Sequence, residues 1–344
     1  MGLLERVGSA LFGDKPPADS AAERQLLDDM IDAVVDAVEP RARMDSRYRQ
    51  KLGGCMRGTI AYLRALGREG LEPALLSRAA WASDPRVNAF FGTADDVPEC
   101  LGRSPELRRF FDAAGNAHLQ EAFAVLGMKK EERSVLGMEL QGDVVKRDVA
   151  QVVVCFSGHR IAAPAATLAA ARLELGKRVI LRLAQVALQR IVAADEKATE
   201  LGQHKAYLGS RLRVLQLARD GMEGIVRDPA TIAGEMKTIE RELKETVEGY
   251  IEAKGSLATL DGYLGHIEGV FSHAEQHVVL GRTPLRVSRM GVRVEGEALG
   301  PVNELALAEL SLGADWRAAI AMVRCPRAGL PSKEALVAAA ERSL

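Results

Sequence analysis

Three of the six histidines lie close together in the sequence, at His266, His273 and His277. On a continuous helix, His273 and His277 are one turn apart, so both imidazole rings could reach one metal ion. His266 precedes His273 by two turns and shares that face. A metal-binding enzyme or sensor with these three ligands, completed by a fourth from elsewhere, is therefore one hypothesis. The simpler alternative is that they are surface histidines on a solvated helix.

A second group of candidate residues surrounds a predicted tight turn at Arg289, Met290 and Gly291. The segment from Arg286 to Val292 resembles the second half of the PilZ signature, a family that binds cyclic di-GMP through RxxxR and a later [D/N]xSxxG. Ser288 and Gly291 match, whereas Arg286 stands at the Asp/Asn position, and the RxxxR formed by Arg282 and Arg286 overlaps the second motif. The resemblance implies a cyclic-dinucleotide effector with Arg282, Arg286 and Ser288 at the ligand. A β-turn that needs Gly291 explains the same letters without a ligand.

Other motifs that carry chemistry are missing or weak. Ser157 and His159 lie near each other, but the chain has no GxSxG elbow, P-loop or GxGxxG sequence. The four cysteines form no CxxC pair. Asp95, Asp96 and Glu99 form an acidic loop, for which a solvated loop or helix cap is the commoner outcome. Without a recognisable catalytic group of residues, we expect a protein that is not an enzyme and needs no cofactor.

Composition limits the classes of partner. The 344 residues include 46 basic and 47 acidic side chains, so no basic excess is present for general nucleic-acid binding. Free, widely spaced cysteines and the lack of a secretory signal favour the cytoplasm. Residues 1–19 read as a short amphipathic segment and linker. A weak contact with a membrane surface would use its apolar side chains, which are Leu3, Leu4, Val7, Leu11 and Phe12.

The strongest structural pattern is a heptad repeat between Ile232 and Val278. Apolar residues recur every seven positions in two registers, which is typical of a coiled coil. A weaker repeat precedes Asp228 and Pro229, which form a helix start. Two such helices joined by a short connection should fold back on each other as a hairpin roughly 65–70 Å long.

The period of the apolar residues defines the other elements. Residues 20–130 are predicted to form a helical domain, with one helix from Leu107 to Leu126. Residues 134–165 and 278–344 carry mainly β patterns, and the heptad helices of residues 166–277 lie between them. Because the arms of an antiparallel hairpin begin and end together, both β stretches should belong to one domain. The predicted fold class is α+β, mostly α, with a coiled-coil hairpin inserted in a small antiparallel β domain.

These patterns favour a non-enzymatic interaction or scaffold protein. A long coiled coil with no catalytic constellation is typical of proteins that bind a partner, or another copy of themselves, through a projecting stalk. The polar seam residues Lys205, Arg219 and Thr246 could set register or partner choice. The histidine and PilZ-like hypotheses are the two alternatives.

Overall fold

The computed structural model describes residues 21–68, 72–141, 144–220, 228–295, 300–313 and 316–331. It has an α+β fold in which a long helical hairpin is inserted between two strands of an antiparallel sheet, as the sequence predicts. The described residues form two compact units. We call the first the sheet unit, which comprises residues 21–26, Thr59–Ile180 and the described residues from His273 onward. The second is the hairpin unit, which comprises Leu27–Gly58 and the described residues of Leu181–Ser272.

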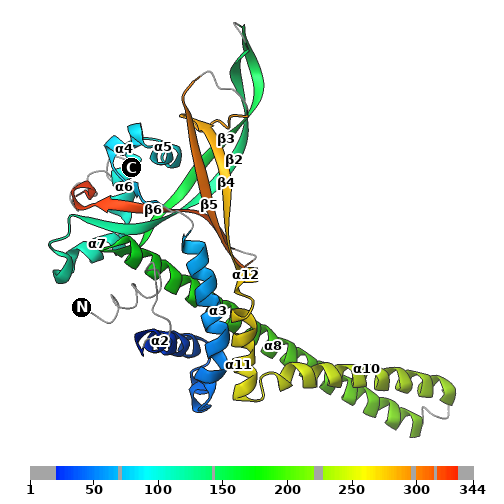
Figure 1. The fold of residues 1–344 in the computed structure, drawn as a ribbon. Coiled ribbons are helices and arrows are strands. Elements are labelled where there is room, and N and C mark those ends of the chain that lie inside the picture. The colour runs from blue at the N-terminus through cyan, green and yellow to red at the C-terminus, as the bar shows by residue number, and fades with distance from the viewer. Residues whose placement is uncertain are drawn as a thin grey trace. The chain divides into compact units, whose positions relative to one another are not determined.

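One sheet contains the strands that precede the hairpin and those that follow it (Figure 1). Its order is β3-β2-β6-β5-β4, and the short β1 adds to β6 in parallel. The strands are β1 (Ala74–Leu75), β2 (Glu121–Gln141), β3 (Val144–Ala165), β4 (Val278–Ser288), β5 (Val302–Leu312) and β6 (Trp316–Pro326). The expectation that the two β stretches meet in one sheet is confirmed.

The two end strands of this order are bridged by the chain that follows β4. Val292 pairs with Val153 of β3, and Arg293 pairs with Val287 of β4. The Val154 N–H donates to the Gly291 carbonyl at 2.8 Å, which fixes the turn against β3. The chain after β4 therefore joins the two edge strands of the sheet, β3 and β4, by backbone hydrogen bonds at this point.

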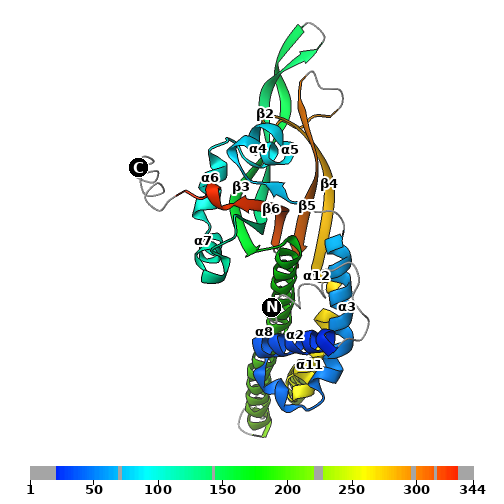
Figure 2. The same cartoon turned by 60° about the vertical axis from the view of Figure 1, so that its left-hand side comes forward.

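Short helices pack beside the sheet and share its core (Figure 2). They are α4 (Arg78–Ser83), α5 (Pro85–Phe90), α6 (Asp96–Arg103) and α7 (Pro105–Asp112). Ser104 caps α7 by accepting the Leu107 N–H at 3.2 Å, and Pro105 occupies the first turn of this helix. The fully buried side chains of this core include Leu76, Phe91, Leu101, Leu107, Leu126 and Met128.

The helix predicted from Leu107 to Leu126 is wrong beyond Asp112. A 3₁₀ turn, η2 (Ala114–Asn116), follows, and β2 begins at Glu121. Residues 121–128 pair with β6 on one side and mostly with β3 on the other, so two neighbouring strands satisfy their backbone groups. The expected helical domain over residues 20–130 is divided between the two units. Residues 27–58 belong to the hairpin unit, and the rest of its described part belongs to the sheet unit.

The hairpin unit contains the long helices. It contains η1 (Pro40–Met44), α10 (Pro229–Gly255) and α11 (Leu260–Phe271). Three further helices contribute residues to both units: α2 (Ala21–Val38), α3 (Tyr48–Arg68) and α8 (Leu168–Asp220). The seam between α8 and α10 is apolar, as the heptad pattern predicts. Its cluster near the connection consists of Leu208, Leu215, Ile232, Met236 and Ile239.

The second arm is not the single helix that its heptad letters suggest. α10 ends at Gly255, and α11 begins after Thr259, whose hydroxyl accepts the Gly262 N–H at 3.2 Å. A β-carbon at Gly262 would collide with the Ser256 carbonyl, so the break depends on glycine there. The heptad spacing of apolar residues nevertheless continues across the break, because Leu257, Leu264 and Phe271 are all buried although they do not lie on one continuous helix.

Candidate functional site

The three histidines of the metal hypothesis do not lie on one continuous helix. His266 belongs to α11 in the hairpin unit, whereas His273 is the N-cap and His277 the last residue of α12 (Ala274–His277) in the sheet unit. His273 has φ −126° and ψ 43°, so the helix does not continue through it. Within the described ranges, no group of three or more His, Cys, Asp or Glu side chains is arranged to hold a metal ion.

The turn from Ser288 to Gly291 explains why this segment has the residues that resemble the PilZ signature. The Ser288 hydroxyl accepts the N–H groups of Met290 and Val292, each at 3.2 Å. Gly291 has φ +79°, and a β-carbon there would lie 2.8 Å from the Val154 carbonyl oxygen. Serine and glycine are therefore both required by the turn that bridges β4 to β3.

The arginines of the same hypothesis lie on β4. Arg286 lies beside a hollow of about 360 Å³ that Lys130 and Arg293 also line, and Arg282 lies outside it. Carboxylates accompany these cations: Arg286 Nε is 2.9 Å from Glu304 Oε1, and Glu132 contacts both Lys130 and Arg293. The hollow thus has three basic side chains whose charge is largely compensated.

Ser157 and His159 do not form a catalytic pair. The Ser157 hydroxyl donates to Glu131 at 3.3 Å, whereas His159 Nε2 lies 2.7 Å from the Phe90 carbonyl oxygen. The His159 ring also stacks on Phe91, with 4.6 Å between centroids. These contacts give His159 a structural role, joining α5 to β3.

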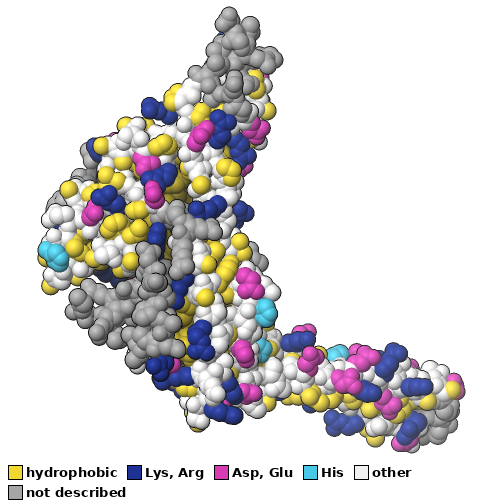
Figure 3. Space-filling view, in the orientation of Figure 1, with side chains coloured by type: hydrophobic (Ala, Val, Ile, Leu, Met, Phe, Trp, Pro, Cys, Tyr) yellow, Lys and Arg dark blue, Asp and Glu magenta, His cyan; other side chains and the backbone are white. Residues whose placement is uncertain are grey.

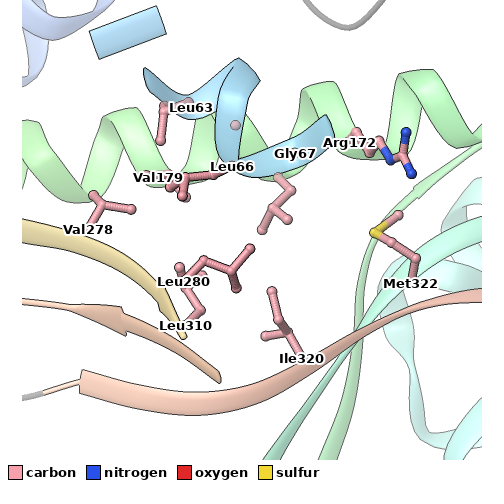
Figure 4. A pocket seen from close by; sticks show the side chains of 12 residues that line it. Leu63, Leu66, Gly67, Arg172, Val179, Val278, Leu280, Leu310, Ile320 and Met322 are labelled. Atoms are coloured by element: carbon pink, nitrogen blue, oxygen red, sulfur yellow. The ribbon is translucent and has the colours of Figure 1, made fainter. Parts of the chain in front are cut away.

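An apolar cavity of about 60 Å³ lies in the sheet unit between the end of α3, the start of α8 and strands β4 to β6 (Figure 4). Leu63, Val179, Leu280 and Met322 are among its lining residues, and Arg172 is the one charged side chain among those that the structure describes there. Ligand sites for small molecules are usually several hundred cubic ångströms in volume. This cavity is too small for a substrate and is a gap in the packing.

The polar residues of the hairpin seam, Lys205, Arg219 and Thr246, contact other residues of the same hairpin. Lys205 Nζ lies 4.6 Å from the centre of the Tyr250 ring, a cation–π distance. The Thr246 hydroxyl donates to the Glu242 carbonyl at 2.8 Å, and Arg219 pairs with Asp220 at 2.9 Å. Lys205 and Thr246 are thus accommodated within the seam, and Arg219 is paired on its own helix.

The most unusual surface of the hairpin unit is on α8. Five large apolar side chains there are half-exposed or more: Leu181 (51%), Val192 (48%), Tyr207 (58%), Val214 (63%) and Leu217 (74%). At 100° per residue they fall within an arc of about 80°. The buried seam residues, such as Ala198 and Leu208, point to the other side of the helix. α8 is therefore apolar on two opposite sides, and α10 covers only one.

We call these five residues the outer stripe. Exposed charged side chains of both signs accompany it: Glu196 lies within the same arc, Glu200 and Arg211 lie beside one edge of it, and Arg213 lies beyond the other edge. Figure 3 shows side chains of both signs on the visible face of the hairpin. The stripe cannot be recognised from the sequence, because only the position of α10 shows which apolar residues of α8 are left exposed.

Comparisons with protein-family models, curated proteins and solved structures found no match to this chain. None of the helices that the structure describes is long and apolar enough to cross a membrane. The fold and its surfaces define an α+β protein with an inserted helical hairpin, and its function has to be inferred from those surfaces.

Proposed function

We propose that this protein is a non-enzymatic cytoplasmic interaction protein that binds a helical partner through the outer stripe of α8. The observation that carries the proposal is the alignment of all five exposed large apolar side chains of α8 along one side. Isolated exposed apolar residues are ordinary, but Tyr207, Val214 and Leu217 gather within three turns on one side of α8, which indicates a contact surface.

Helical packing explains why the partner should be a helix. Val192, Tyr207, Val214 and Leu217 follow spacings of 15, 7 and 3, which keep them on one face of α8. Burying an exposed apolar side chain of this size stabilises a complex by about 1–2 kcal/mol. The four cysteines, all described and all free, support the cytoplasmic part of the proposal.

The test replaces the outer stripe without disturbing the seam. Tyr207→Gln, Val214→Gln and Leu217→Gln are combined in one variant, because glutamine is a good helix former. Lys237→Gln, Lys244→Gln and Glu248→Gln on the exposed side of α10 form the matched control. Self-association is measured by light scattering, and stable complexes by cross-linking in a lysate of the source cells.

We expect the stripe variant to lose its complexes at least tenfold while circular dichroism stays unchanged, and the control to behave as the parent protein does. A stripe variant that assembles and cross-links like the parent protein would overturn the proposal.

A second candidate function, a cyclic-dinucleotide effector, rests on the hollow beside Arg286, where a phosphate would have to displace Glu132 and Glu304 from the three basic side chains. Titration calorimetry with cyclic di-GMP tests it directly. Binding that weakens at least tenfold in Arg286→Ala would support this candidate, and the absence of heat would remove it.

A further inference from the structure

We propose that the sheet unit has a binding site of its own, which takes an extended peptide as an added strand where β5 and β6 separate. The outer stripe belongs to the hairpin unit, so this site does not rest on the proposed function. The evidence begins with strand pairing. β4 pairs with the whole of β5, from Ser288 opposite Val302 to Val278 opposite Leu312, whereas β6 pairs with β5 only from Ala308 to Leu312.

Beyond this point β6 turns away from β5 (Figure 1). Its following residues pair with the short β1 instead, beginning at Ala74 opposite Val323. Within the described residues, no strand pairs with β5 from Val302 to Leu307 on the side away from β4. The sheet therefore has a free strand edge in its interior, between β5 and β6.

The hydrogen bonds of β4 show which backbone groups lie on this free edge. The Arg286 carbonyl accepts the Val294 N–H at 3.0 Å, so Arg286 directs its backbone groups away from β5. In an antiparallel ladder this direction alternates along each strand, and opposite residues share it. Glu304, opposite Arg286, and Ala306 therefore direct their N–H and C=O groups into the split. No residue that the structure describes bonds to these four groups.

A hollow of about 670 Å³ lies along this edge. Ala306 lines it from β5, Met322 from β6, Ala74 from β1 and Phe90 from α5. Sites for ligands have volumes of roughly 300–1,000 Å³, so the hollow has room for a bound molecule. An extended peptide presents backbone donors and acceptors at the spacing that Glu304 and Ala306 require, as in other cases of strand addition. The free edge therefore identifies the ligand as a peptide strand.

Charge narrows the class of peptide. Three acidic side chains line the hollow: Glu72, Asp84 and Glu304. Among the lining residues that the structure describes, Arg86 is the one cation, and it pairs with Asp84 at 2.9 Å. Glu304 pairs at 2.9 Å with Arg286, which lies outside this hollow. The exposed Glu72 carboxylate thus leaves the rim acidic, and the complementary peptide has a lysine or arginine beside small apolar residues.

The probe for this site comes from a random library of seven-residue peptides displayed on phage and selected on the full chain. The tightest-binding peptide is synthesised unmodified and in two N-methylated forms, one for each alternating set of its amides. Only one set of amides faces β5 in an added strand. We expect one N-methylated form to bind at least tenfold more weakly and the other to stay within about threefold of the unmodified peptide.

A variant of the free edge tests the protein side of the contact. Ala306→Pro removes an N–H that faces the split and leaves the hydrogen bonds between β4 and β5 in place. It should weaken the unmodified peptide at least tenfold while circular dichroism stays unchanged. Glu72→Gln should weaken a lysine-containing peptide by about threefold. The triple glutamine variant of the outer stripe is the control and should bind the peptide as the parent protein does.

Three results would overturn the proposal. They are a library that yields no binding peptide, equal binding of the two N-methylated forms, and undiminished binding by a folded Ala306→Pro variant. If Ala306→Pro does not fold, the two N-methylated peptides still decide the question on the parent protein. Weaker binding by the outer-stripe variant would place the peptide on α8 instead and would equally refute this site.

Discussion

Gly202 of α8 faces the ring of Tyr250 on α10 across the hairpin seam. A β-carbon at Gly202 would lie 3.3 Å from Tyr250 Cε2. The ammonium nitrogen of Lys205 lies 4.6 Å from the centre of the same ring. A glycine and a lysine, which both look unsuited to a coiled-coil seam, therefore accommodate one large side chain of the opposite helix.

This relationship predicts opposite effects at two glycines of α8. Gly202→Val should destabilise the hairpin unit by about 1–3 kcal/mol, because the added carbons overpack the ring. Gly209 has open space around its β-carbon direction, so Gly209→Ala should stabilise the helix by about 0.5–1 kcal/mol. Urea unfolding followed by helical circular dichroism measures both. Equal effects of the two changes would contradict the assigned seam.

The turn at Gly291 should be among the least tolerant positions of the sheet unit. In Gly291→Ala the residue keeps a positive φ, and its β-carbon would lie 2.8 Å from the Val154 carbonyl oxygen. The substitution should lower the free energy of unfolding by about 2–4 kcal/mol. Gly313 has a similar φ of +71° but nothing within 4 Å. Gly313→Ala should therefore cost only the backbone strain, about 1–2 kcal/mol.

Thermal unfolding of the two alanine variants separates these contributions. A Gly291→Ala variant as stable as Gly313→Ala would show that the contact with β3 does not constrain the turn. The edge-to-edge bridge of the sheet would then have to be reconsidered.

Glu106 should contribute an acid-sensitive part of stability. Partial burial raises the pKa of its carboxyl, but hydrogen bonds from Arg178 at 2.6 Å and from the Ala163 N–H at 3.0 Å outweigh this and hold the pKa below the ordinary value. A lowered pKa in the folded state stabilises above the unfolded pKa of about 4.5, and this contribution is lost as pH falls through the folded pKa.

Glu106→Gln should accordingly destabilise the protein by about 1 kcal/mol at pH 7, and the difference from the parent protein should shrink toward pH 3. Urea titrations at both pH values measure it. Glu99→Gln, which removes a surface pair with Arg103, is the control and should change stability by less than about 0.5 kcal/mol. A pH-independent difference at Glu106 would rule out the charge as its cause.

His266 should make the hairpin unit sensitive to mild acid. Burial and the nearby Arg190 guanidinium both lower the pKa of its ring, and the buried Nε2 has no hydrogen-bond partner among the residues that the structure describes. Because the folded state favours the neutral ring, stability should fall as pH drops below the unfolded pKa of about 6.5, until the folded pKa is passed.

His266→Phe should remove this dependence between pH 7 and pH 5, measured by unfolding of the helical signal. His118→Gln, at an exposed position of the sheet unit, should leave it intact. An unchanged pH profile in His266→Phe would assign the acid sensitivity to another group.

Local patterns in the sequence determined several elements of this protein. The seam of α8 and α10 follows from heptad spacing, because an α-helix exposes every third or fourth residue on one face whatever surrounds it. The start of α7 follows from Ser104 and Pro105, and the turn after β4 follows from Ser288 and Gly291. Each depends on backbone preferences of a few neighbouring residues, and so each can be predicted without knowing the fold.

Only the tertiary structure decided the rest. Residues 121–126 form a strand because β6 and β3 satisfy their backbone hydrogen bonds, and those partners lie far away in the sequence. The heptad spacing does not predict the break between α10 and α11, because apolar residues on both sides of it, Leu257 and Leu264, are buried. The outer stripe of α8 appears only once α10 covers the opposite side, because exposure is a property of packing partners and not of the residue itself.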